Sequence, residues 1–244
     1  MQNPRAHLAF LLLLSCGCDR TPSGAAGLAP SPAAASASTA APAASPAPSP
    51  AVIAPASAQG AALAAEVGKP APALSLPNLD GQQVSLADFK GKIVVLEWFN
   101  PGCPFVRAAH TKGSLVDAAK RAQKAGVVWL AINSGAPGQQ GHGIDANRKG
   151  VATFGLPHPV LLDEDGKVGR SYGAQRTPHL FVIDPAGTLV YAGAVDNSPD
   201  GEGEAPEGGT VVRYVDQALG ELAAGKPVSV ASTKAYGCGV KYGK

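Results

Sequence analysis

Most of the first quarter of the chain lacks charged residues. No Asp, Glu, Lys or Arg occurs between Arg20 and Glu66, and residues 21–60 are almost wholly Ala, Pro, Ser, Gly and Thr. Such a segment has little large apolar surface to offset the entropy cost of ordering, so we expect it to stay extended. The rest of the 244 residues is enough for one domain with a buried core.

A basic run is also missing. The formal net charge is only +2, and Lys and Arg are dispersed along the sequence. This leaves no electrostatic basis for binding nucleic acid or a polybasic membrane contact. We therefore expect no nucleic-acid partner.

The apolar run near the start is too short to cross a bilayer. It covers residues 8–14 after Arg5 and His7, which is typical of an export signal. The run ends in Leu13-Leu14-Ser15-Cys16, which resembles the bacterial lipobox, whose cysteine is lipid-modified and becomes the new N-terminus. An ordinary signal peptide is the alternative, and Cys18 is a poorer acceptor.

These observations predict four segments. They are a lipoprotein signal peptide at 1–16, an Ala/Pro/Ser-rich tether at 17–62, a folded domain at 66–226, and a C-terminal tail at 227–244. A coil of about 45 residues spans roughly 35–40 Å, so the lipid anchor would hold the domain near the cell envelope. The residue directly after the lipidated position is Gly17 and not the Asp that is associated with retention in the inner membrane. This difference favours the outer membrane.

Cysteine is scarce, with four in the chain. Cys16 and Cys18 belong to the N-terminal segment, so Cys103 and Cys238 remain for the domain. Two cysteines are too few for a disulfide-stapled scaffold but suffice for a redox pair. Export would place them under oxidising conditions.

The domain alternates short apolar strands with turns and helices. Continuous apolar runs indicate strands covered on both faces. The turns Asn78-Leu79-Asp80-Gly81 and Asp184-Pro185-Ala186-Gly187 indicate hairpins. The order predicts an α/β fold, a mixed central sheet flanked by helices, with an N-terminal hairpin extension. Strands are expected at 73–76, 82–86, 93–99, 127–132, 159–162, 180–183 and 188–192. Helices are expected at 105–125 (weakened at Gly113), at 145–154, in a short segment that ends at Tyr172, and at 210–224.

Three segments together resemble the thioredoxin superfamily. Val94-Val95-Leu96-Glu97-Trp98 followed by Cys103-Pro104 resembles the active-site strand and loop, and Thr177-Pro178 resembles the cis-proline loop that faces that cysteine. The Asp-x-x-Gly hairpin and final helix complete the order over about 68–224. Within the superfamily, the segments 100–105, 127–134 and 236–242 are most similar to peroxiredoxin-like redoxin-domain proteins.

Two departures separate this sequence from its relatives. Val106 stands where a Cys-x-x-Cys oxidoreductase has its second cysteine. Asn100 and Leu96 stand where a peroxiredoxin has Thr or Ser and Pro. The sequence therefore fits neither full site.

Cys103 is the expected nucleophile. A sulfur at a helix start lies among unpaired backbone N–H groups, which stabilise the thiolate and lower the thiol pKa. Pro104 suits the first helical position because it has no N–H. The loop-like surroundings favour reactivity over a buried, inert cysteine.

Further candidates surround this cysteine. A cis bond at Thr177-Pro178 would expose backbone for pairing with a substrate chain, with a trans turn as the alternative. Arg176 would favour an anionic sulfur unless it is solvated. Glu97 lies six residues before Cys103, as the proton-shuttling acid of thioredoxins does, although its position relative to Trp98 differs by one residue from the thioredoxin pattern. If Glu97 is buried, its carboxyl would have a raised pKa and could pass protons. The alternative is a glutamate at the surface.

Cys238 decides the predicted mechanism. A sulfenic acid or mixed disulfide on Cys103 needs another thiol to clear it, and Cys238 lies in a tail able to fold back. A disulfide between subunits or an outside reductant are the alternatives. His110 is expected at the surface, and the histidines lack metal-ligand spacing with the cysteines, so no metal or cofactor is expected.

The preferred function is an extracytoplasmic thiol oxidoreductase with antioxidant character. Cys103 would attack a peroxide or a protein disulfide, with Cys238 as a candidate resolving thiol and an external thiol as reductant. Two other hypotheses remain: disulfide exchange on envelope proteins, and a non-catalytic thioredoxin-fold binding module.

Overall fold

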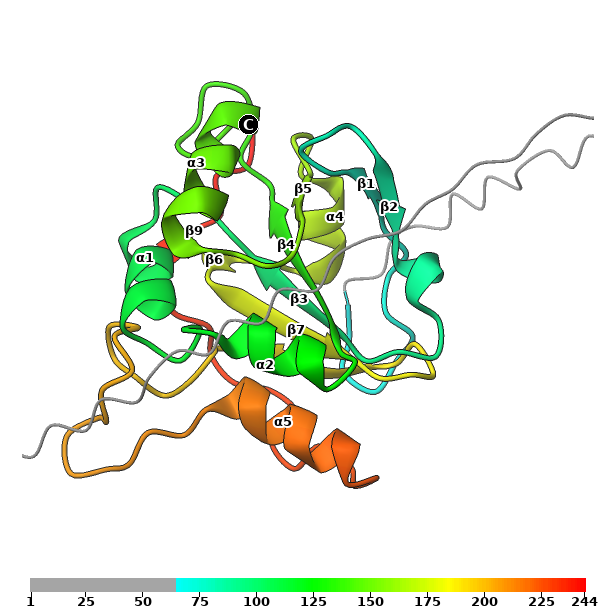
Figure 1. Ribbon diagram of the computed structural model, residues 1–244, viewed down its shortest axis with the longest axis vertical. Helices are drawn as coiled ribbons and strands as arrows, with labels where there is room; N and C mark the ends of the chain where they lie inside the picture. Colours follow the sequence, from blue (N-terminus) through cyan, green and yellow to red (C-terminus); the bar gives the residue numbers. More distant parts are fainter. Residues whose placement is uncertain (1–64) are drawn as a thin grey trace, which may run out of the picture. The chain divides into compact units, whose positions relative to one another are not determined.

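A computed structural model describes residues 65–244 (Figure 1). The predicted signal peptide (1–16), with Cys16, and the whole of the predicted tether (17–62) lie outside the described residues. None of the described helices is long and apolar enough to span a membrane. The elements are β1 Ser75–Pro77, β2 Gln83–Ser85, η1 Leu86–Phe89, β3 Val94–Trp98, α1 Pro104–Thr111, α2 Ala118–Lys124, β4 Val128–Asn133, α3 Ile144–Phe154, β5 Val160–Leu162, α4 Lys167–Tyr172, β6 Arg176–Thr177, β7 His179–Ile183, β8 Leu189–Gly193, α5 Tyr214–Ala223 and β9 Cys238–Gly239.

A five-stranded mixed sheet forms the centre of the domain. Its strand order is β5-β4-β3-β7-β8. β3 runs parallel to β4, and β4 runs parallel to β5, whereas β7 is antiparallel to both β3 and β8. The structure therefore confirms the predicted α/β fold with a mixed sheet and thioredoxin-like order.

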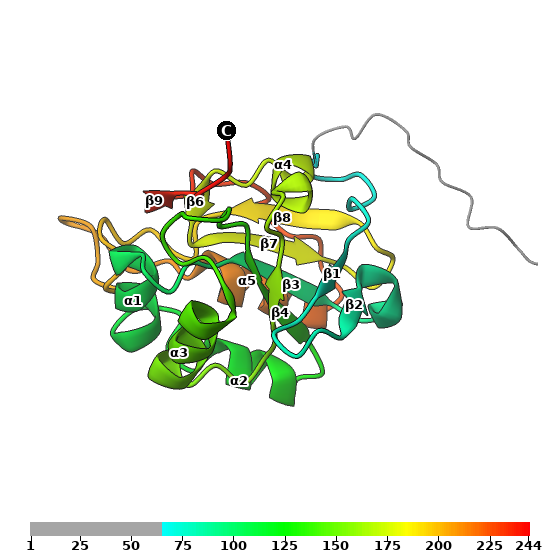
Figure 2. The ribbon, with the colours of Figure 1, turned by 90° about the horizontal axis from the view of Figure 1, so that it is seen from above.

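The central strand β3 is buried on both faces because its side chains alternate between two cores. Val95 packs with α1, α2 and α5. Val94, Leu96 and Trp98 pack on the other side with β1 and α4. Figure 2 shows α4 and α5 on opposite faces of the sheet.

The predicted hairpins are confirmed. β1 pairs antiparallel with β2 around an Asn-Leu-Asp-Gly turn, and β7 pairs antiparallel with β8 around Asp184-Pro185-Ala186-Gly187. In the second turn, the Asp184 carboxylate accepts the Thr188 N–H at 2.8 Å. This side-chain bond closes the turn that the sequence indicated.

The single helix predicted at 105–125 is wrong. The segment forms two helices, α1 and α2, separated by residues 112–117. Gly113 lies so close to the backbone of Gly201 that any side chain there would overlap its carbonyl oxygen. Asp117 then adopts a left-handed conformation (φ 54°) and starts α2 in a new direction. A tertiary contact thus divides a segment of continuous helical composition.

One acidic side chain lies inside the core. Glu97 points from β3 and is fully buried. Its Oε1 lies 2.7 Å from His110 Nε2 on α1, and its Oε2 accepts the Trp129 indole N–H at 3.0 Å. The His110 side chain is only 5% exposed, so the predicted surface position of this histidine is wrong. Its place two turns after Cys103 directs it inward.

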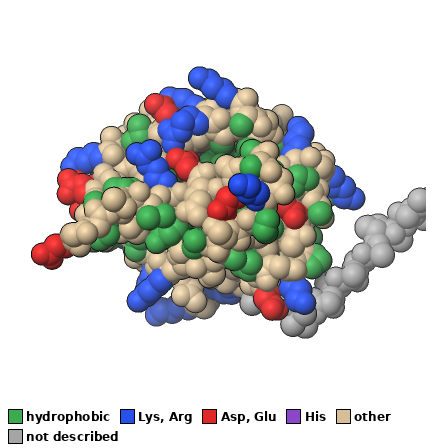
Figure 3. All heavy atoms as spheres, turned by 90° about the horizontal axis from the view of Figure 1, so that it is seen from below, with side chains coloured by type: hydrophobic (Ala, Val, Ile, Leu, Met, Phe, Trp, Pro, Cys, Tyr) green, Lys and Arg blue, Asp and Glu red, His purple; other side chains and the backbone are tan. Residues whose placement is uncertain are grey.

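The surface carries charges of both signs. On the face shown in Figure 3, Lys and Arg side chains lie among Asp and Glu side chains and small hydrophobic groups. This fits the dispersed charge of the sequence.

We predict that His110→Ala lowers the free energy of unfolding by about 3–5 kcal/mol, because it leaves the buried Glu97 carboxylate without its main partner. Folding lowers the Glu97 pKa from its usual 4.5, so the pair stabilises the protein above that pH and ceases to do so as pH falls through the lowered value. Urea denaturation measures the loss. The control is His142→Ala, which breaks a half-exposed pair with Glu164 and should cost at most about 1 kcal/mol. Equal losses would contradict the prediction.

Candidate active site

Cys103 occupies the start of a helix directly after the central strand. It is the N-cap residue of α1, and Pro104 takes the first helical position. The Cys103 N–H donates to the Asn100 carbonyl at 3.0 Å, which closes the turn between β3 and α1. The sulfur is therefore placed near the free N–H groups of the first helical turn, where negative charge is stabilised.

The Thr177–Pro178 loop lies directly against this sulfur. Its peptide bond is cis, the geometry expected from the sequence. The Cys103 thiol donates to the Thr177 carbonyl at 3.1 Å. The Thr177 hydroxyl is buried without a hydrogen-bond partner among the described residues, so it is free to donate to the sulfur when that sulfur is a thiolate.

The C-terminal tail brings the second cysteine to the same place. β9 pairs antiparallel with β6, and the register sets Cys238 opposite Thr177 and Gly239 opposite Arg176. Both cysteines are free thiols, and Cys238 packs against the buried cluster that contains Cys103. Gly237 permits this approach, because a side chain there would overlap the Thr177 carbonyl oxygen.

The two thiols differ in acidity. Burial raises the pKa of Cys103, but hydrogen bonds from the Cys238 thiol, Thr177 and the backbone of Val106 lower it overall. The pKa of Cys238 is raised by burial and by its proximity to Cys103. The pair can therefore hold one negative charge, which resides on Cys103, while Cys238 keeps its proton.

Cys103 is buried, although its loop-like surroundings in the sequence had favoured the alternative to a buried cysteine. The side chain is 0% exposed and packs with Phe99, Val106 and Ala131, with Cys238 against the same cluster. The Asn-Pro-Gly loop before it is polar in sequence, but the Thr177–Pro178 loop and the returning tail cover the sulfur. Any reaction at Cys103 requires these segments to part locally.

Glu97 is buried, which is one of the two alternatives that the sequence left open. The expected rise of its pKa is absent. Burial alone would raise this pKa, yet the attraction and hydrogen bond of His110, with the indole N–H of Trp129, lower it overall. No hydrogen bond joins Glu97 to Cys103 within the described part of the chain. Its role as a proton shuttle stays a prediction.

Arg176 lies on the solvent side of β6. Its side chain is exposed, while the next residue, Thr177, faces the sulfur. Its effect on the thiolate stays a prediction. Val106 is fully buried beneath Cys103, so the position of a second Cys-x-x-Cys sulfur is filled by hydrocarbon.

Sequence reasoning missed two contributors. His110 contacts the Glu97 carboxylate at 2.7 Å. Its spacing of two helical turns from Cys103 was the sequence signal that could have indicated its inward position. Tyr236 anchors the tail two residues before Cys238, because its hydroxyl donates to Asp196 Oδ1 at 2.7 Å. No local pattern announced that contact, since the two residues are forty positions apart.

Comparison with known proteins places this chain in a family. The model of the family described as Redoxin matches residues 66–211. Thiol-disulfide oxidoreductase ResA of Geobacillus thermodenitrificans is 33% identical over 127 residues, 52% of this chain and 68% of the relative. A Coxiella burnetii protein named as a candidate peroxiredoxin, bcp, is 31% identical over 120 residues, 48% of this chain and 72% of that protein.

A solved structure agrees over a longer stretch. A hypothetical protein of Sinorhizobium meliloti 1021 superposes with a TM-score of 0.63 at 26% identity, covering 73% of this chain and 95% of its own. The predicted relation to the thioredoxin superfamily and its redoxin-domain members is confirmed. The chain belongs to the Redoxin family and is a thiol oxidoreductase with the thioredoxin fold.

Proposed function

We propose that this protein is an extracytoplasmic thiol oxidoreductase in which Cys103 attacks the oxidant and Cys238 resolves the product. One observation carries the proposal: the β6–β9 register sets Cys238 opposite Thr177, whose carbonyl accepts from the Cys103 thiol at 3.1 Å. A nucleophile of lowered pKa beside a thiol of raised pKa is the arrangement that a two-cysteine redox cycle needs.

A hydroperoxide would oxidise the cysteine pair in two steps. The Cys103 thiolate attacks one oxygen; an S–O bond forms, the O–O bond breaks, and the leaving oxygen takes a proton to depart as water or alcohol. Cys103 is thereby oxidised by two electrons to a sulfenic acid. Cys238 then attacks this sulfur; the S–S bond forms, the S–O bond breaks, and the proton of Cys238 leaves in water. An external dithiol reduces the disulfide by two exchange steps.

The closed tail favours a small oxidant over a protein disulfide. An extended substrate chain would pair with the backbone beside Thr177, but β9 already fills that edge. Cys103 is also fully buried, and a peroxide needs a far smaller opening than a polypeptide does. Antioxidant activity on small peroxides is therefore our preferred reading.

Disulfide exchange on envelope proteins is the second candidate. Its support is the ResA relative, whose name is thiol-disulfide oxidoreductase. In this mode the Cys103 thiolate attacks a protein disulfide, one substrate sulfur leaves as a thiolate, and Cys238 frees the mixed disulfide by a second exchange. The tail would first have to leave β6. A thioredoxin-fold binding module without turnover is the third candidate.

The proposed location is the cell envelope. The apolar run at 8–14 and Leu13-Leu14-Ser15-Cys16 support export and lipid attachment at Cys16. The redox domain, 66–226, and its tail, 227–244, would then sit on a tether of residues 17–62. Thiols there meet oxidising conditions, in which a reversible dithiol needs a dedicated reductant.

The redox pair predicts a specific mass change. Mild peroxide should remove about 2 Da from the intact reduced protein, because both thiol hydrogens are lost when the disulfide forms. Cys238→Ser should instead gain about 16 Da as a trapped sulfenic acid, and Cys103→Ser should stay unchanged. Intact-mass spectrometry measures all three. Loss of two hydrogens without Cys103, or inert behaviour of every form, would refute the proposed chemistry.

The closed tail predicts a contrast between two glycine variants. Gly237→Ala should speed iodoacetamide alkylation of Cys103 by about tenfold or more, because its methyl group displaces β9 from Thr177 and opens the site. Gly225→Ala, just after α5 and before the tail begins, is the matched control: its glycine also has positive φ (67°), but a methyl group there meets nothing within 4 Å. Equal alkylation rates in the two variants would mean that the tail does not guard the sulfur.

Lipid attachment is tested separately. With Cys16→Ser, the expressed protein should lose metabolic labelling by a fatty-acid probe and leave the membrane fraction, since a lipid chain is its only proposed anchor. Cys18→Ser is the control and should keep both. Labelling that persists without Cys16 would move the anchor to another residue.

A further inference from the structure

The loop between β8 and α5 carries oxygen ligands at a recurring spacing. Residues 196–207 read Asp-Asn-Ser-Pro-Asp-Gly-Glu-Gly-Glu-Ala-Pro-Glu. Calcium loops of twelve residues take ligands from positions 1, 3, 5, 7, 9 and 12, with Gly at 6 and Glu at 12. Here those two places hold Gly201 and Glu207, and Asp196, Ser198 and Asp200 occupy positions 1, 3 and 5. Ser198 is the one departure, and it supplies a hydroxyl where Asp or Asn is usual.

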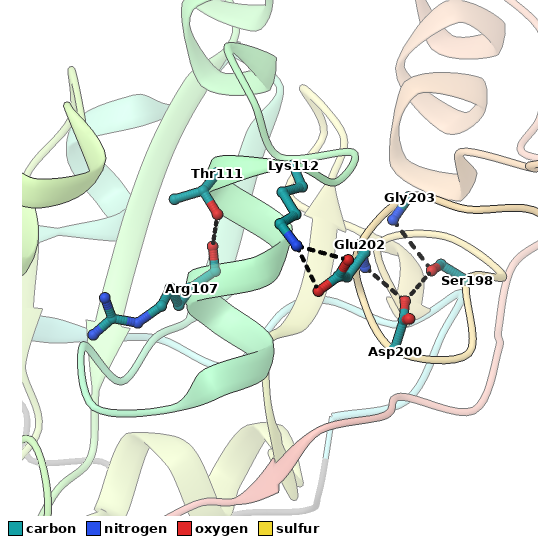
Figure 4. Close-up of polar contacts among 7 residues, drawn as sticks. All are labelled: Arg107, Thr111, Lys112, Ser198, Asp200, Glu202 and Gly203. Carbon is teal, nitrogen blue, oxygen red and sulfur yellow. Dashed lines mark hydrogen bonds and ion pairs between the residues drawn. The ribbon is translucent and has the colours of Figure 1, made fainter.

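Hydrogen bonds within the loop join the candidate ligand residues to one another. The Ser198 N–H donates to Asp196 Oδ1 at 3.0 Å, and the Ser198 hydroxyl donates to Asp200 Oδ1 at 3.0 Å. The Glu202 N–H also donates to Asp200 Oδ1, at 2.8 Å. Figure 4 shows Ser198, Asp200 and Glu202 gathered in this loop beside α1. Gly201 has φ 83°, the left-handed turn that position 6 requires.

One carboxylate oxygen of Asp196 is buried without a hydrogen-bond partner among the described residues. The residue is 1% exposed, and its Oδ1 faces the loop, where it accepts from Ser198, and the tail, where it accepts from Tyr236. The other oxygen, Oδ2, is buried and has no hydrogen-bond partner among the described residues. A buried carboxylate oxygen left unsatisfied is costly, and a cation bound by the Asp196 carboxylate would satisfy it.

We propose that residues 196–207 bind one Ca²⁺ ion. Asp196, Ser198 and Asp200 would supply side-chain oxygens, Glu202 its carbonyl, and Glu207 its carboxylate. This all-oxygen set suits a hard cation and not zinc or copper. The Glu202 carboxylate is not needed, since Lys112 already holds it at 2.9 and 3.0 Å (Figure 4).

Closing the loop around an ion requires its side chains to rearrange. Within residues 65–244, no three His, Cys, Asp or Glu side chains converge as a metal site. Two of the five proposed ligands are a hydroxyl and a carbonyl, and Glu207 is exposed. Binding would therefore draw Glu207 inward to complete the shell.

The ion would also reach the candidate active site. Tyr236 bonds Asp196 and lies against Gly201, two residues before Cys238. A cation on Asp196 would fix this anchor and hold the tail closed. Binding itself does not depend on the proposed redox chemistry.

Calorimetric titration of the reduced full-length chain with CaCl₂ tests the proposal. We expect saturable one-to-one binding, with a Kd in the range of extracellular calcium modules, about 10⁻⁴–10⁻³ M, and weaker binding of MgCl₂. Glu207→Gln and Asp200→Asn should each weaken binding by about tenfold or more, with the calcium-free melting temperature unchanged for the exposed Glu207. Asp145→Asn, an exposed acid on α3, is the matched control and should bind as the parent does.

Two results would overturn the site. One is the absence of saturable binding up to about 10 mM Ca²⁺, above the range of such modules. The other is binding that neither loop variant weakens, which would place the ion elsewhere. A second readout tests the link to the tail: saturating Ca²⁺ should slow alkylation of Cys103 in the parent but not in Glu207→Gln, and failure of this readout alone would remove the link while the titration decides the site.

Discussion

The antiparallel pairing of β9 with β6 governs what Cys103 can do. Only two residues of the tail take part, but their register sets Cys238 opposite Thr177, the residue whose carbonyl receives the Cys103 thiol. The same pairing buries the sulfur and occupies the backbone edge that an extended peptide would use. Access to Cys103, the acidity of its thiol and the proposed resolution by Cys238 therefore all depend on whether this short strand stays in place.

Burial and acidity work against each other at this sulfur. Removing a thiolate from water raises its pKa, which on its own would leave Cys103 inert. Donors compensate: the Cys238 thiol, Thr177 and the first-turn N–H of Val106 lower the pKa overall. Glu97 on β3 shows the same balance, because His110 and Trp129 more than offset its burial. In both places the direction of the shift follows from the partners and not from the depth of burial.

The sequence predicted elements and order well because these depend on local pattern. The continuous apolar run of β3, the hairpin turns at 78–81 and 184–187 and Pro104 after Cys103 are local signals, and each lies where expected. The break between α1 and α2 was missed because it arises from contact of Gly113 with Gly201, almost ninety positions away. The burial of Cys103 and the inward position of His110 were missed for the same reason, since the covering tail and the partner Glu97 come from other parts of the fold.

The place of the second sulfur has a physical consequence of its own. In a Cys-x-x-Cys helix both sulfurs sit on one rigid element, so oxidation changes little else. Here Val106 fills that position with hydrocarbon, and the partner sulfur lies on a tail held by a two-residue strand and the Tyr236–Asp196 hydrogen bond. A disulfide would fix this tail covalently, whereas reduction leaves it held by these weak contacts alone. The redox state of Cys103 and Cys238 would then set how readily the site opens, which couples the chemistry of the pair to the access of its next substrate.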